Sequence, residues 1–273
     1  MPELPEVETV KETLKKKILK QKIIDIKVLY PEMIEYPDVL TFKKEIINQT
    51  INDIKRRGKW LIFELDNYYL LSHLRMEGKY NIKTNESINK HEHVIFYFKD
   101  FNLRYQDTRK FGRMYLYKKE EAFDNTPLNA LGYEPWDNKL NIDYLKEKYK
   151  KITKPIKEVL LDQSIIVGIG NIYADEILFL SKINPYRKPN ELDNNELNDI
   201  IKNTRYVLEC AIKKGGTTIR TYTSSEGVHG RFQQDLLVHN QEYCKKCNSK
   251  IEVVRIGGRS TYYCPNCQKN CQK

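Results

Sequence analysis

The chain has 273 residues, of which 40% are hydrophobic and 31% charged, and it carries a net charge of +10 with a pI near 9.1. This composition is too apolar for a disordered protein, and no apolar run approaches the roughly 18–20 residues of a membrane span. No apolar signal region follows the start, so we expect a soluble, intracellular protein of two or three domains. The excess of basic residues favours a polyanionic partner, with nucleic acid ahead of a membrane surface.

The segment from Pro5 to about Leu19 is predicted to form an amphipathic helix. Pro5 suits a first helical turn, where its missing N–H costs nothing, and Glu6 and Glu8 complement the positive end of the helix dipole. The apolar residues recur at steps of three and four, which is the helical period, at Val7, Val10, Leu14 and Ile18.

A β domain is predicted from about Ile23 to Tyr117, because the apolar residues there alternate or fall into short runs. Turn residues such as Asp66-Asn67 and Lys99-Asp100 separate these runs. We therefore expect an antiparallel sandwich or barrel, whose strands include residues 60–65, 69–74, 94–98 and 114–117.

The pattern then becomes helical. Thr153 is expected to cap one helix with Pro155 inside its first turn, and Asn171 is expected to cap the next. A longer helix is predicted from about Asn194 to Gly215-Gly216, since glycines commonly end helices. The apolar stripe of this helix consists of Leu197, Ile200, Ile201, Thr204, Val207, Leu208 and Ala211.

Four of the six cysteines form two close pairs, Cys244-x2-Cys247 and Cys264-x2-Cys267, with sixteen residues between the pairs. This spacing fits a four-cysteine zinc ribbon. Four thiolates close a tetrahedral shell and leave no position for water, so we expect one structural zinc ion.

The residues between the cysteine pairs are predicted to form a hairpin that turns at Gly257-Gly258. Arg259 lies at its tip, where the guanidinium can serve as a phosphate clamp or remain an ordinary surface charge. Cys210 lies on the apolar helix stripe and is expected in the core, whereas Cys271 has no assignable role.

These elements predict an α+β protein with three domains. Residues 1–132 would hold the N-terminal helix and the antiparallel β-sandwich, 133–234 a helical domain that ends in a polar loop, and 235–273 the metal module.

The N-terminus offers a second kind of chemistry. If Met1 is removed, Pro2 presents a free secondary amine, and α-amino groups titrate near ~8. Attack of this amine on a sugar C1′ gives an iminium ion after base loss and ring opening, and that ion is an electron sink for eliminations. Glu3 is adjacent and Glu6 lies one helical turn away, so either can move protons. Judged from residue chemistry alone, ordinary helix capping is the favoured reading of these glutamates.

Six motifs, in this order, resemble the bacterial formamidopyrimidine-DNA glycosylase family, also called 8-oxoguanine DNA glycosylase/AP lyase. The resemblance extends from Pro2 to about Gln268. The motifs are PELPEVET at 2–9, RGK at 57–59, HLRMEGK at 73–79, DTRKFG at 107–112, GIGNIYADE at 168–176 and GRST at 258–261.

The resemblance implies a catalytic set. Pro2 would be the Schiff-base nucleophile, and Glu3 the proton donor and acceptor around the sugar. Lys59 would assist β-elimination and Arg259 would assist δ-elimination, each while contacting phosphate.

It also implies a set of DNA contacts. Asn171 would bind backbone phosphate from a helix–two-turn–helix element, and a polar loop at 217–230 would cover the flipped base. His91 matches a DNA-contacting position, with His93 as the candidate if the register shifts by two. An enzyme that extrudes a base must fill the gap, and three residues would do so. The gap-filling residues would be Met76, Arg109 and Phe111, and the further DNA-contacting candidates are His73 and Glu6.

The expected activity is excision of oxidised purines, namely 8-oxoguanine and formamidopyrimidines, from duplex DNA, followed by strand cleavage through β,δ-elimination. We expect a monomer that acts in the bacterial cytoplasm. Two alternatives stay open. An endonuclease VIII-like glycosylase for oxidised pyrimidines is disfavoured by Leu4, where that branch typically has glycine. A non-catalytic zinc-ribbon DNA-binding protein would explain the charge and the cysteines but not the N-terminal motif.

Overall fold

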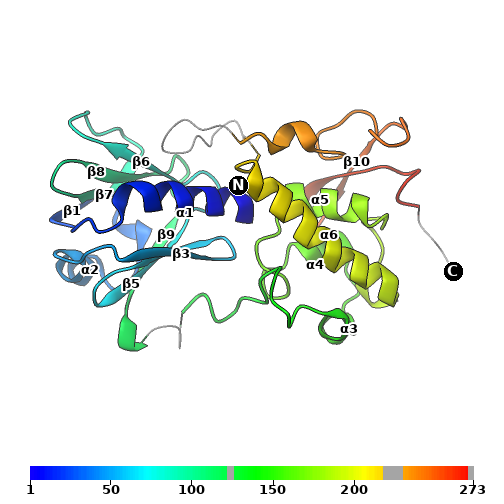
Figure 1. Cartoon of the computed structure of the whole chain (residues 1–273), viewed down its shortest axis with the longest axis horizontal. Coiled ribbons are helices and arrows are strands. Elements are labelled where there is room, and N and C mark those ends of the chain that lie inside the picture. The colour runs from blue at the N-terminus through cyan, green and yellow to red at the C-terminus, as the bar shows by residue number, and fades with distance from the viewer. Residues whose placement is uncertain (122–125, 218–229, 270–273) are drawn as a thin grey trace. The chain divides into compact units, whose positions relative to one another are not determined.

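The computed structural model describes residues 1–121, 126–217 and 230–269 (Figure 1). The chain separates into two compact units, the first made of residues 1–129 and 217–230, and the second of 130–216 and 231–273. The cysteine module thus belongs to the same unit as the helices, and the three-domain division stays a prediction. Among the described residues, no helix is long and apolar enough to cross a membrane.

The first unit begins with helix α1 (Leu4–Ile18), as the sequence predicted. Its four periodic apolar residues are buried, because this face packs against strands β3 (Asp53–Arg57) and β4 (Trp60–Glu64). Glu3 and Glu6 form a capping box at the start of the helix, and Leu19 ends it in an extended conformation. The residue pattern and the observed helix therefore agree.

Two sheets make up most of the first unit. The five-stranded sheet has the order β2-β9-β5-β4-β3 and the four-stranded sheet the order β1-β7-β8-β6. The four strands predicted by residue range are confirmed as β4, β5, β7 and β9. The predicted antiparallel arrangement is confirmed, with one exception: the short strand β2 pairs with β9 in parallel. The remaining bounds are β1 (Asp25–Val28), β2 (Ile34–Tyr36), β5 (Tyr68–His73), β6 (Lys79–Lys83), β7 (Glu92–Tyr97), β8 (Asn102–Gln106) and β9 (Arg113–Lys118).

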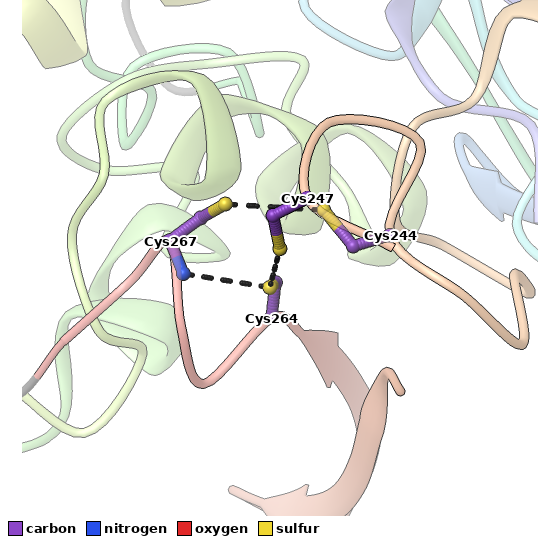
Figure 2. Close-up of side chains that lie close together, drawn as sticks. All are labelled: Cys244, Cys247, Cys264 and Cys267. Atoms are coloured by element: carbon purple, nitrogen blue, oxygen red, sulfur yellow. Dashed lines mark hydrogen bonds between the residues drawn. The ribbon is translucent and has the colours of Figure 1, made fainter. Parts of the chain in front are cut away.

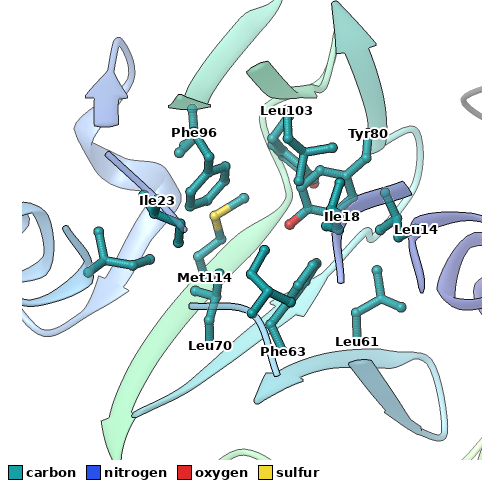
Figure 3. Close-up of a cluster of buried hydrophobic side chains, with 14 of the residues drawn as sticks. Leu14, Ile18, Ile23, Leu61, Phe63, Leu70, Tyr80, Phe96, Leu103 and Met114 are labelled. Carbon is teal, nitrogen blue, oxygen red and sulfur yellow. The ribbon is translucent and has the colours of Figure 1, made fainter. Parts of the chain in front are cut away.

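The core of this unit lies between the two sheets (Figure 3). Phe96 and Leu103 come from the four-stranded sheet, and they meet Phe63 and Met114 from the five-stranded sheet. Helix α1 adds Leu14 and Ile18 at one side of the cluster, each fully buried.

A short helix, α2 (Val39–Ile46), interrupts the predicted β region. Asp38 caps it, because its side chain accepts hydrogen bonds from the backbone N–H groups of Leu40 and Thr41. Only Phe42 and Ile46 are buried, and one turn of apolar spacing is too short to stand out from a strand pattern.

The second unit is built on helices, of which the long one was predicted correctly. It runs from Asn194 to Lys213 as α6, it buries the whole predicted stripe, and it is followed by Gly215 and Gly216 at φ 74° and 80°. The other elements are α3 (Ile142–Tyr149), α4 (Ile156–Leu160), α5 (Asn171–Leu180), β10 (Glu252–Ile256), β11 (Arg259–Tyr263) and the 3-10 turns η1 (Pro31–Met33), η2 (Lys119–Glu121), η3 (Pro189–Glu191) and η4 (Phe232–Asp235), the first two of which lie in the first unit.

Two predicted caps were wrong by one or two residues. Helix α4 has Pro155 rather than Thr153 as its N-cap. Its first backbone N–H, that of Ile156, donates to the carbonyl of Arg187 at 2.7 Å and therefore needs no side-chain cap. Helix α5 has Gly170 as its N-cap, which makes Asn171 the first helical residue. The Asn171 side chain is therefore available for another role.

Candidate functional site

The N-terminal residues lie inside the first unit. Pro2 is buried and Glu3 is only 3% exposed. The backbone N–H of Glu3 donates to Glu6 Oε2 at 2.9 Å, so the capping box also fixes the position of the residue next to Pro2. The chain therefore enters α1 in a single, well-defined orientation.

Glu6 holds a second segment against the start of α1. Its Oε1 accepts hydrogen bonds from the backbone N–H of Thr217 at 2.7 Å and from the Thr217 hydroxyl at 3.1 Å. Glu6 is 1% exposed, and both of its carboxylate oxygens accept hydrogen bonds from protein groups. This geometry suits a positioning role better than the predicted direct contact with DNA. Most of the loop predicted at 217–230 lies outside the described residues.

Lys59 sits in the tight turn between β3 and β4. Arg57 pairs with Trp60 across this turn, and Gly58 adopts φ 56°, a left-handed conformation that glycine takes without strain. Lys59 is buried, which is unusual for a lysine. The turn thus aims an amine into the protein rather than into solvent.

Arg56 connects this turn to α1, a contact that the sequence did not reveal. Its Nε donates to Glu8 Oε2 at 2.7 Å, and its Nη1 donates to the Gly58 carbonyl at 2.9 Å. Burial disfavours the Glu8 carboxylate, but hydrogen bonds from Lys11 and Arg56 outweigh it and lower the pKa of Glu8. The ion pair therefore stays formed at neutral pH and holds the Lys59 turn to the helix that follows Pro2.

The amine at the start of the chain lies within electrostatic range of this group. Burial lowers the pKa of the Met1 amine, the nearby carboxylates of Glu3 and Glu6 oppose that shift, and the charge of Lys59 adds to it. Lys59, which lies far from Pro2 and Glu3 in sequence, is thus brought close enough to act on the amine beside them. An amine, a carboxylate and a lysine in one buried place can form an imine and move protons.

His73 lies at the end of β5 and is held in one tautomer. Its Nδ1 accepts a hydrogen bond from the Arg75 backbone N–H at 2.9 Å, so the neutral ring carries its proton on Nε2. Burial, with the positive charges of Arg75 and Lys59, lowers the pKa of His73 to about 3. His73 is therefore a neutral hydrogen-bond donor at physiological pH.

The three predicted gap-filling residues lie on two loops. Met76 follows β5 and is half-buried, whereas Arg109 and Phe111 are exposed on the loop after β8. Phe111 is 46% exposed, which excludes burial in the β core and confirms the predicted exposed tip. The Arg109 guanidinium lies over the Phe111 ring at 4.7 Å, so the two side chains form one cation–π pair.

Asp107 shapes the second of these loops. It is fully buried, and its two carboxylate oxygens accept the backbone N–H groups of Arg109 at 3.0 Å and Gly112 at 2.8 Å. Lys110 at the loop tip has φ 59°, a conformation that costs free energy in a non-glycine residue. The loop is thus held in a strained form by one carboxylate.

The backbone contacts of Asp107 distinguish the two histidines that were candidates for a DNA contact, His91 and His93. The ring Nε2 of His93 lies 2.8 Å from the Asp107 carbonyl, and His93 is only 2% exposed, which does not favour a contact with DNA. His91 is half-buried, and its carbonyl accepts the Asp107 N–H at 3.0 Å. His91 remains the candidate, next to the loop that carries Arg109.

In the second unit, a buried ion pair positions the start of α5. Lys157 Nζ donates to Asp175 Oδ1 at 2.5 Å and to the Asn171 carbonyl at 2.8 Å, and both charged side chains are fully buried. The other oxygen of Asp175 lies 2.6 Å from His239 Nδ1 and accepts the N–H of Tyr262 on β11 at 3.3 Å. One carboxylate therefore joins α4, α5 and the cysteine module.

Asn171 is joined to the hairpin directly. Its side-chain Nδ2 donates to the carbonyl of Ser260 at 2.8 Å, and Ser260 follows Arg259. Arg259 begins β11 and is exposed, beside an open pocket of about 510 Å³ that Lys151 and Lys154 also line. The two predicted phosphate contacts of this unit are thus linked, because Asn171 is hydrogen-bonded to the residue that directly follows Arg259.

The four predicted metal ligands face one another (Figure 2). Cys244 Sγ lies 3.9 Å from Cys267 Sγ, and Cys247 Sγ lies 3.4 Å from Cys264 Sγ. Zinc–sulfur bonds of about 2.3 Å in a tetrahedron place the sulfur atoms about 3.8 Å apart, close to both distances. The four sulfurs fit a zinc ion and fill its shell, so the metal is structural. Cys210, expected in the core, is only half-buried.

Family models match three segments of the chain. They are the Formamidopyrimidine-DNA glycosylase N-terminal domain at residues 1–114, the Formamidopyrimidine-DNA glycosylase H2TH domain at 131–223, and the zinc finger found in FPG and IleRS at 241–270. The formamidopyrimidine-DNA glycosylase of Oceanobacillus iheyensis is 47% identical over 277 residues, covering 100% of this chain and 99% of that protein.

Two solved structures are similar over nearly the whole chain. A Lactococcus lactis FPG variant in complex with Fapy-dG-containing DNA superposes with a TM-score of 0.93 at 40% identity, covering 98% of this chain and 100% of that one. Wild-type Lactococcus lactis Fpg in complex with DNA that contains an oxidised pyrimidine superposes with a TM-score of 0.91 at 40% identity and the same coverage.

Proposed function

This chain belongs to the formamidopyrimidine-DNA glycosylase family, and from that membership we propose that it excises oxidised purines from duplex DNA and then cleaves the strand. The observation that carries the proposal is that Pro2, Glu3 and Lys59 are all buried, with the charges of Glu3 and Lys59 close enough to act on the amine at the start of the chain. A non-catalytic zinc-ribbon protein has no use for such a group. Burial of two ionisable side chains costs free energy, and chemistry at that place accounts for it.

The reaction starts from Pro2 after loss of Met1. Its nitrogen forms a bond to the sugar C1′, the glycosidic bond breaks, and the base leaves as the sugar ring opens. Glu3 supplies a proton to the ring oxygen, the departing base takes up the proton that the Pro2 nitrogen loses, and the product is a cationic iminium between Pro2 and the sugar. Pro2 is buried in the chain that still carries Met1, and a buried amine favours its unprotonated, nucleophilic form.

Strand cleavage follows from the same iminium. Removal of a proton from C2′ breaks the bond between C3′ and its phosphate oxygen, which is β-elimination. A second elimination breaks the bond between C5′ and the other phosphate oxygen, which is δ-elimination. We assign Lys59 to the first step and Arg259 to the second, each as a phosphate contact that stabilises the leaving group. Glu6 positions Glu3 and Thr217 and does not contact DNA.

Duplex binding is assigned to residues of both units. In the second unit Asn171 and Arg259 hold backbone phosphates, and the zinc ion keeps the Arg259 hairpin folded. In the first unit His73 donates to phosphate through Nε2, and His91 adds a contact beside the Arg109 loop. Binding that depends on several such contacts weakens steeply with salt.

The lesion class rests on the gap-filling set. Met76, Arg109 and Phe111 together with Leu4 favour the purine-excising branch. The Lactococcus lactis relatives have been captured with a Fapy-dG lesion and with an oxidised pyrimidine, so excision of oxidised pyrimidines is the second candidate. Excision rates on 8-oxoguanine opposite cytosine and on an oxidised pyrimidine in the same sequence context separate the two.

The experiment is borohydride trapping on a duplex with 8-oxoguanine opposite cytosine, together with the intact mass of the protein. We expect a covalent adduct that maps to Pro2 in protein that lacks Met1. Pro2→Gly should lose most base excision while it keeps duplex binding, and Pro31→Gly, at an exposed proline, is the matched control. Unchanged excision by Pro2→Gly would exclude this mechanism.

A further inference from the structure

The two loops that carry the gap-filling residues meet at one strand pair. The first loop, residues 74–78, leads into β6, and the second loop, residues 107–112, leaves β8. Strands β6 and β8 are antiparallel neighbours, with Tyr80 opposite Tyr105. The pairing of β6 with β8 therefore places the end of the first loop, at Gly78, beside the start of the second loop, at Asp107.

Tyr105 fills the space between the two loops. It is fully buried, and a Cβ atom added to Gly112 would lie 1.8 Å from its hydroxyl oxygen, while one added to Gly78 would lie 2.1 Å from it. Neither glycine is among the residues with positive φ, so it is space and not backbone conformation that requires glycine at both positions. The phenol occupies the place that two side chains would take.

The phenol is itself held rigidly. Its ring packs edge-on against Tyr80 at 5.1 Å between centroids, and the Tyr80 hydroxyl donates to Ser72 Oγ at 2.7 Å. The two loops have further fixed points close to the glycines, because Gly78 N–H donates to the Leu74 carbonyl and Gly112 N–H to Asp107. Each loop is thus closed on itself and packed against the same hydroxyl.

We propose that Tyr105 is a positioning residue that sets the spacing between Met76 on one loop and the Arg109–Phe111 pair on the other. The inference rests on the proposed function, because only a base-extruding enzyme needs these side chains at a fixed separation. Three groups that enter one gap in a duplex must arrive together, and a misplacement of about 1 Å in such an arrangement can cost about 100-fold in rate. The Tyr105 hydroxyl would prevent either loop from relaxing toward the other.

Tyr105→Phe tests the proposal, because it removes one buried oxygen and keeps the ring. We expect excision of 8-oxoguanine from duplex DNA to fall about 10-fold or more, with a weaker preference for cytosine opposite the lesion. Borohydride trapping on a single-stranded oligonucleotide with an abasic site should stay within about twofold, since no gap has to be filled there. Gly112→Ala, which pushes on the same oxygen, should give the same pattern.

Tyr80→Phe is the matched control, since it also removes a hydroxyl from a buried tyrosine of this strand pair but faces neither glycine. It should leave both activities close to wild type, and thermal melting should show that all variants are folded. Equal losses on the duplex and on the single strand, or an unchanged duplex rate in Tyr105→Phe, would overturn the proposal. Failure of the wild-type protein to be trapped on either substrate would instead contradict the proposed function.

Discussion

The buried ion pair between Lys157 and Asp175 gives the most direct test of what holds the second unit together. Lys157→Met keeps the side chain as far as Cε but removes the amine that donates to Asp175 and to the Asn171 carbonyl. Because both partners are fully buried, water cannot replace the lost contacts. The carboxylate of Asp175 would then keep only its contacts with His239 and Tyr262.

The magnitude follows from the burial. Removal of one partner from a buried pair costs about 3–5 kcal/mol, because an uncompensated charge stays in the interior. The remaining contacts of Asp175 place the expected loss at the lower end, about 3 kcal/mol. For a protein of this size that corresponds to a fall in Tm of roughly 6–12 °C.

Unfolding of this unit can be followed separately. The chain has two tryptophans, Trp60 in the first unit and Trp136 in the second. In a Trp60→Phe background, urea unfolding monitored by fluorescence reports on Trp136 alone. The double variant Lys157→Met/Asp175→Asn removes both charges and should recover part of the lost stability. A loss below about 1 kcal/mol in Lys157→Met, or a double variant as unstable as the sum of the single variants, would refute this account.

Two further predictions concern the metal and His73. Removal of zinc, or Cys244→Ser, should weaken duplex binding by about 10-fold or more, because the Arg259 hairpin would become disordered. The control Cys210→Ser should leave both zinc content and duplex affinity unchanged. Tight duplex binding by protein shown by mass spectrometry to be metal-free would contradict the structural role of the zinc. The pKa of His73 is lowered to about 3 from an ordinary 6.5, so its NMR signals should stay those of a neutral ring down to about pH 4. The contribution of His73 to stability is fully present above pH 6.5 and is lost as the pH falls toward 3, because the unfolded chain takes up the proton at a higher pH than the folded protein does. An acid-induced fall in the urea midpoint that is equally steep in His73→Gln would argue against this.

Long periodic segments and fixed spacings were predictable from the sequence. The stripe of α6, the face of α1 and the paired cysteines each repeat a signal several times, so the structure agrees with them nearly residue by residue. Short elements were not predictable, because α2 and α3 bury two residues each and offer too few positions to reveal a period. The cap of α4 was mispredicted because the backbone carbonyl of Arg187 supplies the contact expected from a side chain.

The site shows the same division. The proposed site residues Pro2, Glu3 and Lys59 and the four cysteines could be named from motifs, whereas the residues that support the proposed site and the proposed DNA contacts could not. Arg56, Asp107, Tyr105 and Lys157 act through partners brought close only by folding, for example Asp175 for Lys157 and Gly78 for Tyr105. A glycine in a motif indicates that something is close to the backbone, but only the structure identifies it as a tyrosine hydroxyl from another strand.

The hydrogen bond from Asn171 to Ser260 has a consequence for how damaged sites are found. It holds two proposed phosphate contacts, Asn171 and Arg259, on one frame, because Ser260 directly follows Arg259 in the chain. Such a frame would respond to the spacing of the backbone phosphates and not to the identity of the bases. It would hold undamaged duplex nearly as well as damaged duplex, which lets the protein scan along DNA without stopping at a particular sequence. Recognition of the lesion would then depend on whether a base can be extruded from the duplex. The residues that hold undamaged DNA, Asn171 and Arg259, would therefore differ from the gap-filling residues that discriminate the lesion, and mutations could change duplex affinity and lesion preference separately.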